Sequence, residues 1–152
     1  CYGLQKPLIA VGSLDALTEV AREDYEAGIL SVSDWDRALL CPMVDARRME
    51  VYAQVFDAEG RPQNEVTAEV IDAGSFREFR EQGRPFVIFG SGARKCAEVL
   101  VGAEFVEVAP SARGLARLAQ QALDEGRTED IAYFEPFYLK DFVVTTSKKS
   151  LF

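Results

Sequence analysis

The stretch from Ala38 to Phe56, ALLCPMVDARRMEVYAQVF, constrains the fold more than any other part of the chain. It holds two apolar runs joined by a charged corner at residues 45–50. In the second run, apolar and polar residues alternate, as in a β-strand with one buried face. The pattern therefore predicts two strands, at about 37–44 and 49–57. Pro42 has no backbone N–H, so the first strand is expected to run along an edge or to bulge there.

The remaining sequence predicts helices and strands in the order typical of an α/β fold. A helix at 14–27, capped by Ser13, precedes the two strands, and a third strand follows at about 64–71. A short strand is also expected at 8–11, and a capping box of Ser75 and Glu78 opens a short helix. Further along, we expect a strand at 85–89 buried on both faces, a helix at about 92–99 and a strand at 105–108. The last helix runs from Pro110 to a Gly126 C-cap, and its apolar stripe consists of Leu115, Leu118, Ala119, Ala122 and Leu123.

An antiparallel three-strand meander continued by parallel crossover strands gives a mixed sheet with helices packed on it. This order is the ribonuclease H-like arrangement, which actin-like (ASKHA) lobes share. The length of 152 residues fits one domain of this kind. The chain begins with Cys1 and not with Met, so we interpret it as a fragment, with residues 1–12 as a lead-in and 145–152 as a loose tail.

Composition limits the possible partners and compartments. The net charge of −8 argues against a broad phosphate-binding face, so direct nucleic-acid binding is not expected. No apolar run approaches the roughly 18 residues that a membrane span needs, and no membrane association is expected. The three cysteines are widely spaced and form no CxxC pair, which is typical of reduced thiols in a cytoplasmic protein.

The sequence contains no histidine. Ser-His-Asp and Cys-His nucleophilic sites, histidine general bases and nearly all common zinc sites are therefore excluded. We expect no metal and no cofactor bound by this chain.

The charged corner is the first candidate site. Asp45 and Glu50 flank Arg47, and two carboxylates beside an arginine can hold a metal ion or perform acid–base chemistry. In this interpretation the protein is a metal-dependent hydrolase. The alternative, which we favour, is a structural corner in which Asp45 or Glu50 pairs with Arg47.

The second candidate site is the turn Gly90-Ser91-Gly92, between a predicted strand and a predicted helix. Backbone N–H groups at a helix start can hold a phosphate, which would make this a nucleotide-binding lobe. The turn lacks the third glycine of a dinucleotide fingerprint and the GK[ST] of a P-loop. We therefore favour a tight turn that needs glycine for its backbone angles.

The aromatic residues and the cysteines have structural interpretations too. The run of Tyr133, Phe134, Phe137 and Tyr138 can stack on RNA bases, but it has few basic neighbours, so core or partner contact is favoured. Trp35 is expected to be a partly buried lid over the core. Cys41 and Cys96 are expected to be small buried hydrophobes.

The corner also carries a resemblance to a known family. Residues 44–52, VDARRMEVY, resemble the DAR-x-x-E-VY string of the TsaB (YeaZ) family of tRNA threonylcarbamoyladenosine factors, with Tyr52 as its last residue. Four further strings resemble family motifs in the same order: PLIAVGSL at 7–14, FGSG at 89–92, PSA with its LA pairs at 110–119, and EPFYLK at 135–140.

The resemblance implies both a role and a missing part. The first-lobe motifs of the family, a D-T-S/T-like strand and GPGS-x-TG-x-RIG, do not occur in this sequence, so the chain corresponds to the second lobe alone. It implies an actin-like lobe without the usual ATP site, formerly described as a glycoprotease relative. TsaB is a non-catalytic partner of the catalytic subunit TsaD, bound largely through the first lobe, and works with the ATPase TsaE. A homodimer is a further possible assembly.

Overall fold

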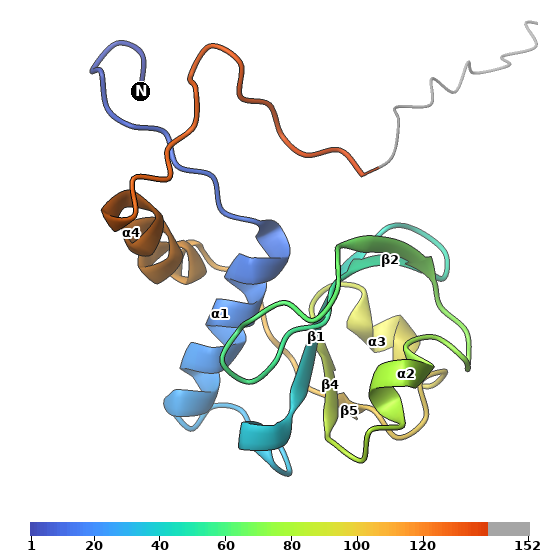
Figure 1. The fold of residues 1–152 in the computed structure, drawn as a ribbon. Helices are drawn as coiled ribbons and strands as arrows, with labels where there is room; N and C mark the ends of the chain where they lie inside the picture. The colour runs from blue at the N-terminus through green and yellow to red at the C-terminus, as the bar shows by residue number, and fades with distance from the viewer. Residues whose placement is uncertain (140–152) are drawn as a thin grey trace, which may run out of the picture.

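The computed structural model describes residues 1–139 of the chain. The tail predicted at 145–152 and the last residue of the EPFYLK string, Lys140, lie outside these residues. A five-stranded sheet forms the centre, with strand order β3-β2-β1-β4-β5 (Figure 1). Its strands are β1 (Leu39–Asp45), β2 (Glu50–Ala53), β3 (Thr67–Val70), β4 (Phe86–Phe89) and β5 (Glu104–Phe105).

The topology confirms the predicted mixed sheet. Strands β1, β2 and β3 are antiparallel neighbours, whereas β4 and β5 run parallel to β1 on its other side. The short helices α2 (Arg77–Arg80) and α3 (Ala93–Cys96) lie in the two crossover connections. This is the strand order of a ribonuclease H-like, actin-like lobe.

The sheet separates two hydrophobic cores, because successive side chains of a strand point to opposite faces. Leu39, Cys41 and Met43 of β1 pack with Phe86 and Ile88 of β4 beneath α2 and α3. Leu40 of β1 and Val87 and Phe89 of β4 belong to the second core, under α1 (Ser13–Glu26). All four residues of β4 are buried, as predicted for a strand covered on both faces.

Helix α1 agrees with the predicted helix, although its N-cap is Gly12 and not Ser13. Tyr25 near its end stacks on Trp35, with ring centroids 4.2 Å apart, and Trp35 is buried as expected. Trp35 begins the 3-10 helix η1 (Trp35–Arg37), which leads into β1.

A second helical layer packs on the outer side of α1. It consists of the 3-10 helix η2 (Ala112–Leu115) and helix α4 (Ala116–Asp124), beside α1 in Figure 1. Ser111 caps η2, and Gly126 follows α4 with a φ of 70°, as predicted. Of the predicted apolar stripe only Ala122 is buried, whereas Leu115 and Leu123 are exposed.

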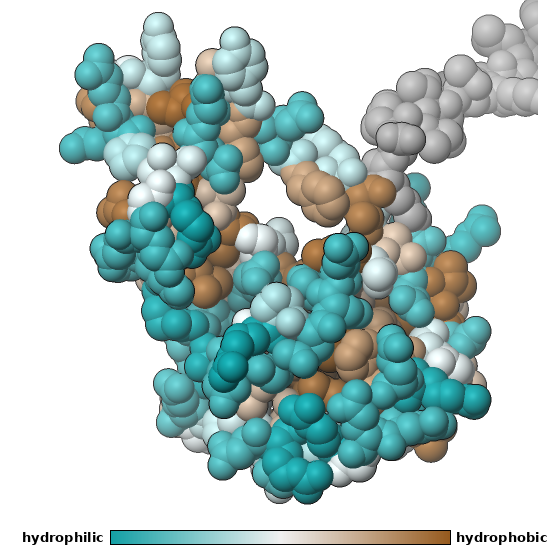
Figure 2. Space-filling model, in the orientation of Figure 1, coloured by the Kyte–Doolittle hydropathy of each residue, from teal (hydrophilic) through white to brown (hydrophobic). Residues whose placement is uncertain are grey.

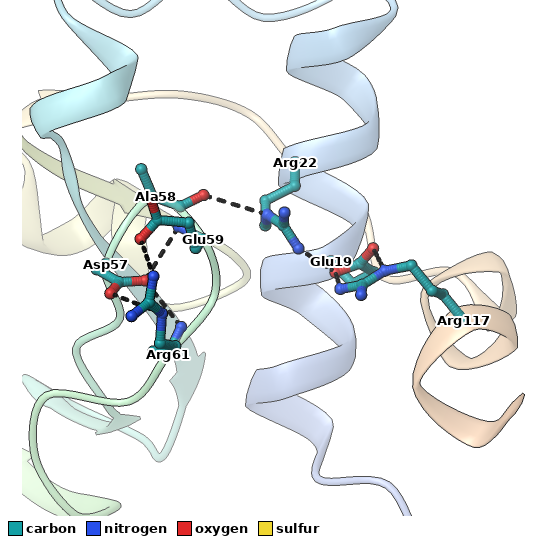
Figure 3. Close-up of polar contacts among 7 residues, drawn as sticks. All are labelled: Glu19, Arg22, Asp57, Ala58, Glu59, Arg61 and Arg117. Atoms are coloured by element: carbon teal, nitrogen blue, oxygen red, sulfur yellow. Dashed lines mark hydrogen bonds and ion pairs between the residues drawn. The ribbon is translucent and has the colours of Figure 1, made fainter. Parts of the chain in front are cut away.

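Glu19 fixes α1 to the segments on either side of it (Figure 3). Its buried carboxylate pairs with Arg117 of α4 and lies 2.9 Å from Arg22. Arg22 in turn donates from Nε to the carbonyl of Ala58, 3.2 Å away, in the turn between β2 and β3. The arginines hold the pKa of Glu19 below its ordinary value, Arg117 contributing most.

Three further local expectations were wrong. Pro42 lies in the central strand, where it pairs with Phe89 of β4. The register to the neighbouring antiparallel strand is the same on both sides of Pro42, at Leu40–Phe56 and at Met43–Ala53, so no residue is inserted as a bulge. The missing N–H instead coincides with an interruption of that ladder, because a proline cannot donate to it.

The other two corrections concern residues 8–11 and the capping box. The predicted strand at 8–11 is reduced to one isolated bridge between Leu8 and Glu129. Ser75 does not cap α2; its hydroxyl accepts from the N–H of Asp72, 2.9 Å away. The N-cap of α2 is Phe76, in the left-handed region with a φ of 56° and no side-chain capping bond.

Candidate functional site

The charged corner is a tight connection between β1 and β2. The N–H of Ala46 donates to the carbonyl of Glu50, and the N–H of Glu50 donates to that of Arg47, each over 3.0 Å. Arg47 and Arg48 both have positive φ, 78° and 50°. Two consecutive left-handed residues let the chain reverse within four residues, which places the acidic residues at the strand ends.

The partner of Asp45 is Lys95 and not the predicted Arg47 side chain. The Asp45 carboxylate pairs with Lys95 Nζ and accepts from the backbone N–H of Arg47, 3.1 Å away. Lys95 Nζ also donates to the carbonyl of Glu50, over 2.8 Å. The hydrogen bond from Lys95 is the main reason that the pKa of Asp45 lies below its usual range.

The glycine turn packs directly against this corner. The N–H of Gly92 donates to the carbonyl of Met43 at 2.9 Å, and the Ser91 hydroxyl accepts from the N–H of Asp45 at 3.1 Å. A Cβ on Gly92 would lie 2.7 Å from Val51 Cγ1, and one on Gly90 would lie 2.5 Å from the Met43 carbonyl oxygen. The turn requires glycine because β1 and β2 come this close to its backbone.

The fold therefore brings the two sequence-predicted sites together at the carboxyl ends of β1 and β4. The two sites contact each other through the N–H of Gly92, which donates to the Met43 carbonyl, and through the N–H of Asp45, which donates to the Ser91 hydroxyl. The N–H of Ala93 donates to the Gly90 carbonyl within the turn. Tyr52, the remaining motif residue, is half-buried on β2 between Val44 and Ala68 of the neighbouring strands. Across residues 1–139, no group of three or more Cys, Asp or Glu residues is arranged to hold a metal ion.

A groove of about 650 Å³ lies beside this corner on the α1 face of the sheet, and the sequence did not predict it. It is bounded by the start of α1, by strands β1 and β2, and by residues 134–139, which pass over it. Figure 2 shows apolar side chains on both sides of the opening beneath this segment. Its lining includes Leu14, Asp15, Val44, Tyr52, Val66, Phe134 and Phe137.

Partial burial at the groove raises the pKa of Asp15 above its ordinary value. The only sequence signal for the groove was the aromatic run, for which core or partner contact was expected. Within this chain, Tyr133, Phe137 and Tyr138 are not core residues; Phe137 is 78% and Tyr138 75% exposed.

Comparison with known proteins identifies the fold. No protein-family model matches the sequence, and no curated protein matches it significantly. Among solved structures, YeaZ from Pseudomonas aeruginosa superposes with a TM-score of 0.66 at 20% identity over 90% of this chain. In fold, this chain is similar to YeaZ.

A second Pseudomonas aeruginosa structure, described as an uncharacterized protein with similarity to peptidase YEAZ, gives a TM-score of 0.63 at 21% identity over 91% of this chain. This chain spans 62% of the length of each of these two proteins. At these identities the likeness establishes the α/β, actin-like fold. No helix among the described residues is long and apolar enough to cross a membrane.

Proposed function

We propose that this chain is the second lobe of a TsaB (YeaZ)-type protein and serves as a non-catalytic partner subunit in the synthesis of threonylcarbamoyladenosine at position 37 of tRNA. The observation that carries the proposal is the YeaZ-like fold over 90% of the chain, combined with family-like motifs in the same order along the sequence. The fold alone does not carry the proposal, because one fold hosts many functions. The ordered motifs are the second observation that the proposal needs.

The geometry of the corner supports a structural role for the family-like motif. Asp45, the glycine turn and Lys95 connect the antiparallel half of the sheet to the helix that follows β4. Arg47 holds the turn through its backbone N–H and its left-handed conformation. In this proposal the chain uses no cofactor of its own, and ATP is consumed only by the partner subunits.

The test is reconstitution of the tRNA modification. The product of the complete gene is combined with the TsaD- and TsaE-type proteins of the same organism, ATP, the threonylcarbamoyl donor system and tRNA. We expect the complete protein to co-purify with the TsaD-type subunit and modification to depend on its presence. Failure of the complete protein to bind that subunit would refute the proposal.

A double variant separates the scaffold from the enzyme hypothesis. In the metal-dependent alternative, Asp45→Asn with Glu50→Gln removes the proposed carboxylates and abolishes turnover. In the scaffold proposal the same variant, checked for folding by circular dichroism, still supports modification in proportion to the TsaD-type subunit that it binds. Glu59→Gln, on an exposed turn, is the matched control for loss of a surface carboxylate.

A further inference from the structure

A pocket lined by three arginines lies at the opposite end of the sheet from the charged corner. It has a volume of about 230 Å³ and lies between α2, the start of β4 and the loop after α3. Its lining includes Arg77, Arg80, Arg84, Glu81, Phe86 and Val101. Figure 2 shows hydrophilic side chains over this part of the molecule, where Figure 1 places α2.

Two of the three guanidinium groups have no carboxylate partner within the described part of the chain. Arg80 donates only to carbonyls, those of Ala73 at 2.9 Å, Ser75 at 3.3 Å and Val101 at 2.7 Å. Arg84 donates from Nε to the carbonyl of Arg37 at 2.7 Å. Only Arg77 pairs with an acid, the exposed Glu81 at 3.4 Å.

The carbonyl contacts fix the position of the charge without neutralising it. Arg80 uses three of its five N–H groups on the carbonyls, which leaves two for another acceptor. Arg84 is bonded through Nε, so its terminal nitrogens stay available among the described residues. Both side chains are half-buried, and a guanidinium held in one orientation loses little entropy on binding an oxyanion.

We propose that this pocket binds a phosphate group, as inorganic phosphate or as a phosphate of a larger ligand. A phosphate monoester carries a charge of about −1.5 to −2 at neutral pH, which matches the two unpaired arginines. Its oxygens accept the paired N–H groups of guanidinium in the bidentate geometry that arginine favours. The site is independent of the proposed scaffold role, since it lies at the other end of β1 and β4 from the corner.

The first test is titration of the whole protein with sodium phosphate by isothermal titration calorimetry, at constant ionic strength maintained with chloride. Arg80→Gln with Arg84→Gln removes the two guanidinium groups that have no carboxylate partner and is expected to weaken phosphate binding about tenfold or more. Arg61→Gln with Arg94→Gln removes the same charge from exposed sites elsewhere and is expected to leave binding within about twofold of the wild type. Equal affinities of the two double variants would overturn the proposal.

A second variant removes no arginine, so it tests the site without disturbing the hydrogen bonds that Arg80 donates to the backbone. Glu81→Gln deletes the one carboxylate in the pocket lining, so phosphate is expected to bind several times more tightly. Glu78→Gln changes a neighbouring exposed acid on α2 that does not line the pocket, and is expected to leave the affinity unchanged. If Glu81→Gln does not bind more tightly than Glu78→Gln, the pocket is not the phosphate site.

Three further ligands distinguish the source of the phosphate group. Adenosine monophosphate that binds as tightly as inorganic phosphate would assign the site to a terminal phosphate. A short RNA that binds more tightly, with an affinity that falls as salt is raised, would assign it to a backbone phosphate. Acetate that competes as well as phosphate would overturn the proposal, because it would show a general attraction for anions.

Discussion

Replacement of Gly90 would combine backbone strain with a steric clash. Gly90 has a φ of 102°, and an added Cβ would lie 2.5 Å from the backbone oxygen of Met43 and 2.8 Å from Leu17. Gly90→Ala is therefore expected to lower the free energy of unfolding by about 3 kcal/mol or more, from strain and steric clash together. Urea denaturation measures the change.

Gly28 provides the matched control for this prediction. It also has a positive φ, 73°, but its added Cβ would meet nothing within 4 Å. Gly28→Ala is expected to cost only the left-handed strain of about 1–2 kcal/mol. Equal costs for the two variants would show that the glycine turn does not pack against β1 as described.

At the residue scale, the sequence did not specify the partners of the site residues. The structural role expected of Asp45 and the glycine turn stays a prediction, and the structure adds which groups they contact: the Asp45 N–H donates to Ser91 and its carboxylate accepts from the Arg47 N–H. The ion pair of Asp45 with Lys95 joins residues 50 positions apart, and nothing local in the sequence specifies it. Conversely, the predicted Ser75 cap was wrong because Phe76 adopts a left-handed conformation that local pattern does not reveal.

At the element scale, the contact between α1 and α4 depends on the Glu19 carboxylate (Figure 3), whose side chain is 7% exposed. Glu19→Gln is expected to lower the free energy of unfolding at pH 7 by about 1–2 kcal/mol, because half-exposed Arg117 loses its charged partner. The control substitution Glu59→Gln removes a carboxylate that is 65% exposed and should change the free energy of unfolding by less than about 1 kcal/mol.

The difference in the free energy of unfolding between wild type and Glu19→Gln depends on pH, because the pKa of Glu19 is depressed. A depressed carboxyl pKa stabilises the folded state above the unfolded-state pKa, about 4.3 for glutamate, and the contribution is lost as the pH falls through the folded-state value. The difference between wild type and Glu19→Gln should therefore be constant from pH 7 to about 5 and shrink below pH 4. Urea denaturation across this range tests it; a difference that grows on acidification would contradict it.

The elements themselves were predictable where their signals are local. Helix α1 and strand β4 follow from side-chain periodicity and from a continuous apolar run. The position of Pro42 was not predictable, since its pairing depends on a crossover that brings β4 beside β1. Helix α4 was predicted with its apolar stripe, but the pattern does not say whether another element covers the stripe, and Leu115 and Leu123 are exposed in this chain.

At the scale of the whole molecule, general topology rules were sufficient to predict the arrangement of the sheet, but they did not predict the groove or the arginine pocket. A meander followed by crossover strands permits few arrangements, and the observed order is one of them. The groove combines the start of α1 with residues 134–139, which lie more than a hundred positions away in the sequence. Such distant pairings depend on tertiary packing, which a single sequence does not encode in any local pattern.

The three cysteines allow a test of this packing over the whole molecule. Cys1 is exposed, whereas Cys41 and Cys96 are buried in the core between the sheet and the helices α2 and α3. Burial also raises the pKa of both inner thiols, so the reactive thiolate is scarce at neutral pH. We expect one thiol to react rapidly with a disulfide reagent such as DTNB and two to react only when the core opens.

For a domain of ordinary stability, about 5 kcal/mol or more, the two inner thiols should react at least about a thousandfold more slowly than Cys1 in native buffer. Cys1→Ser should abolish the fast phase and leave the slow one unchanged. Urea should accelerate the slow phase in parallel with the unfolding followed by circular dichroism, because both thiols lie in the same core. Rapid reaction of two or three thiols without denaturant would show that this face of the sheet is not closed.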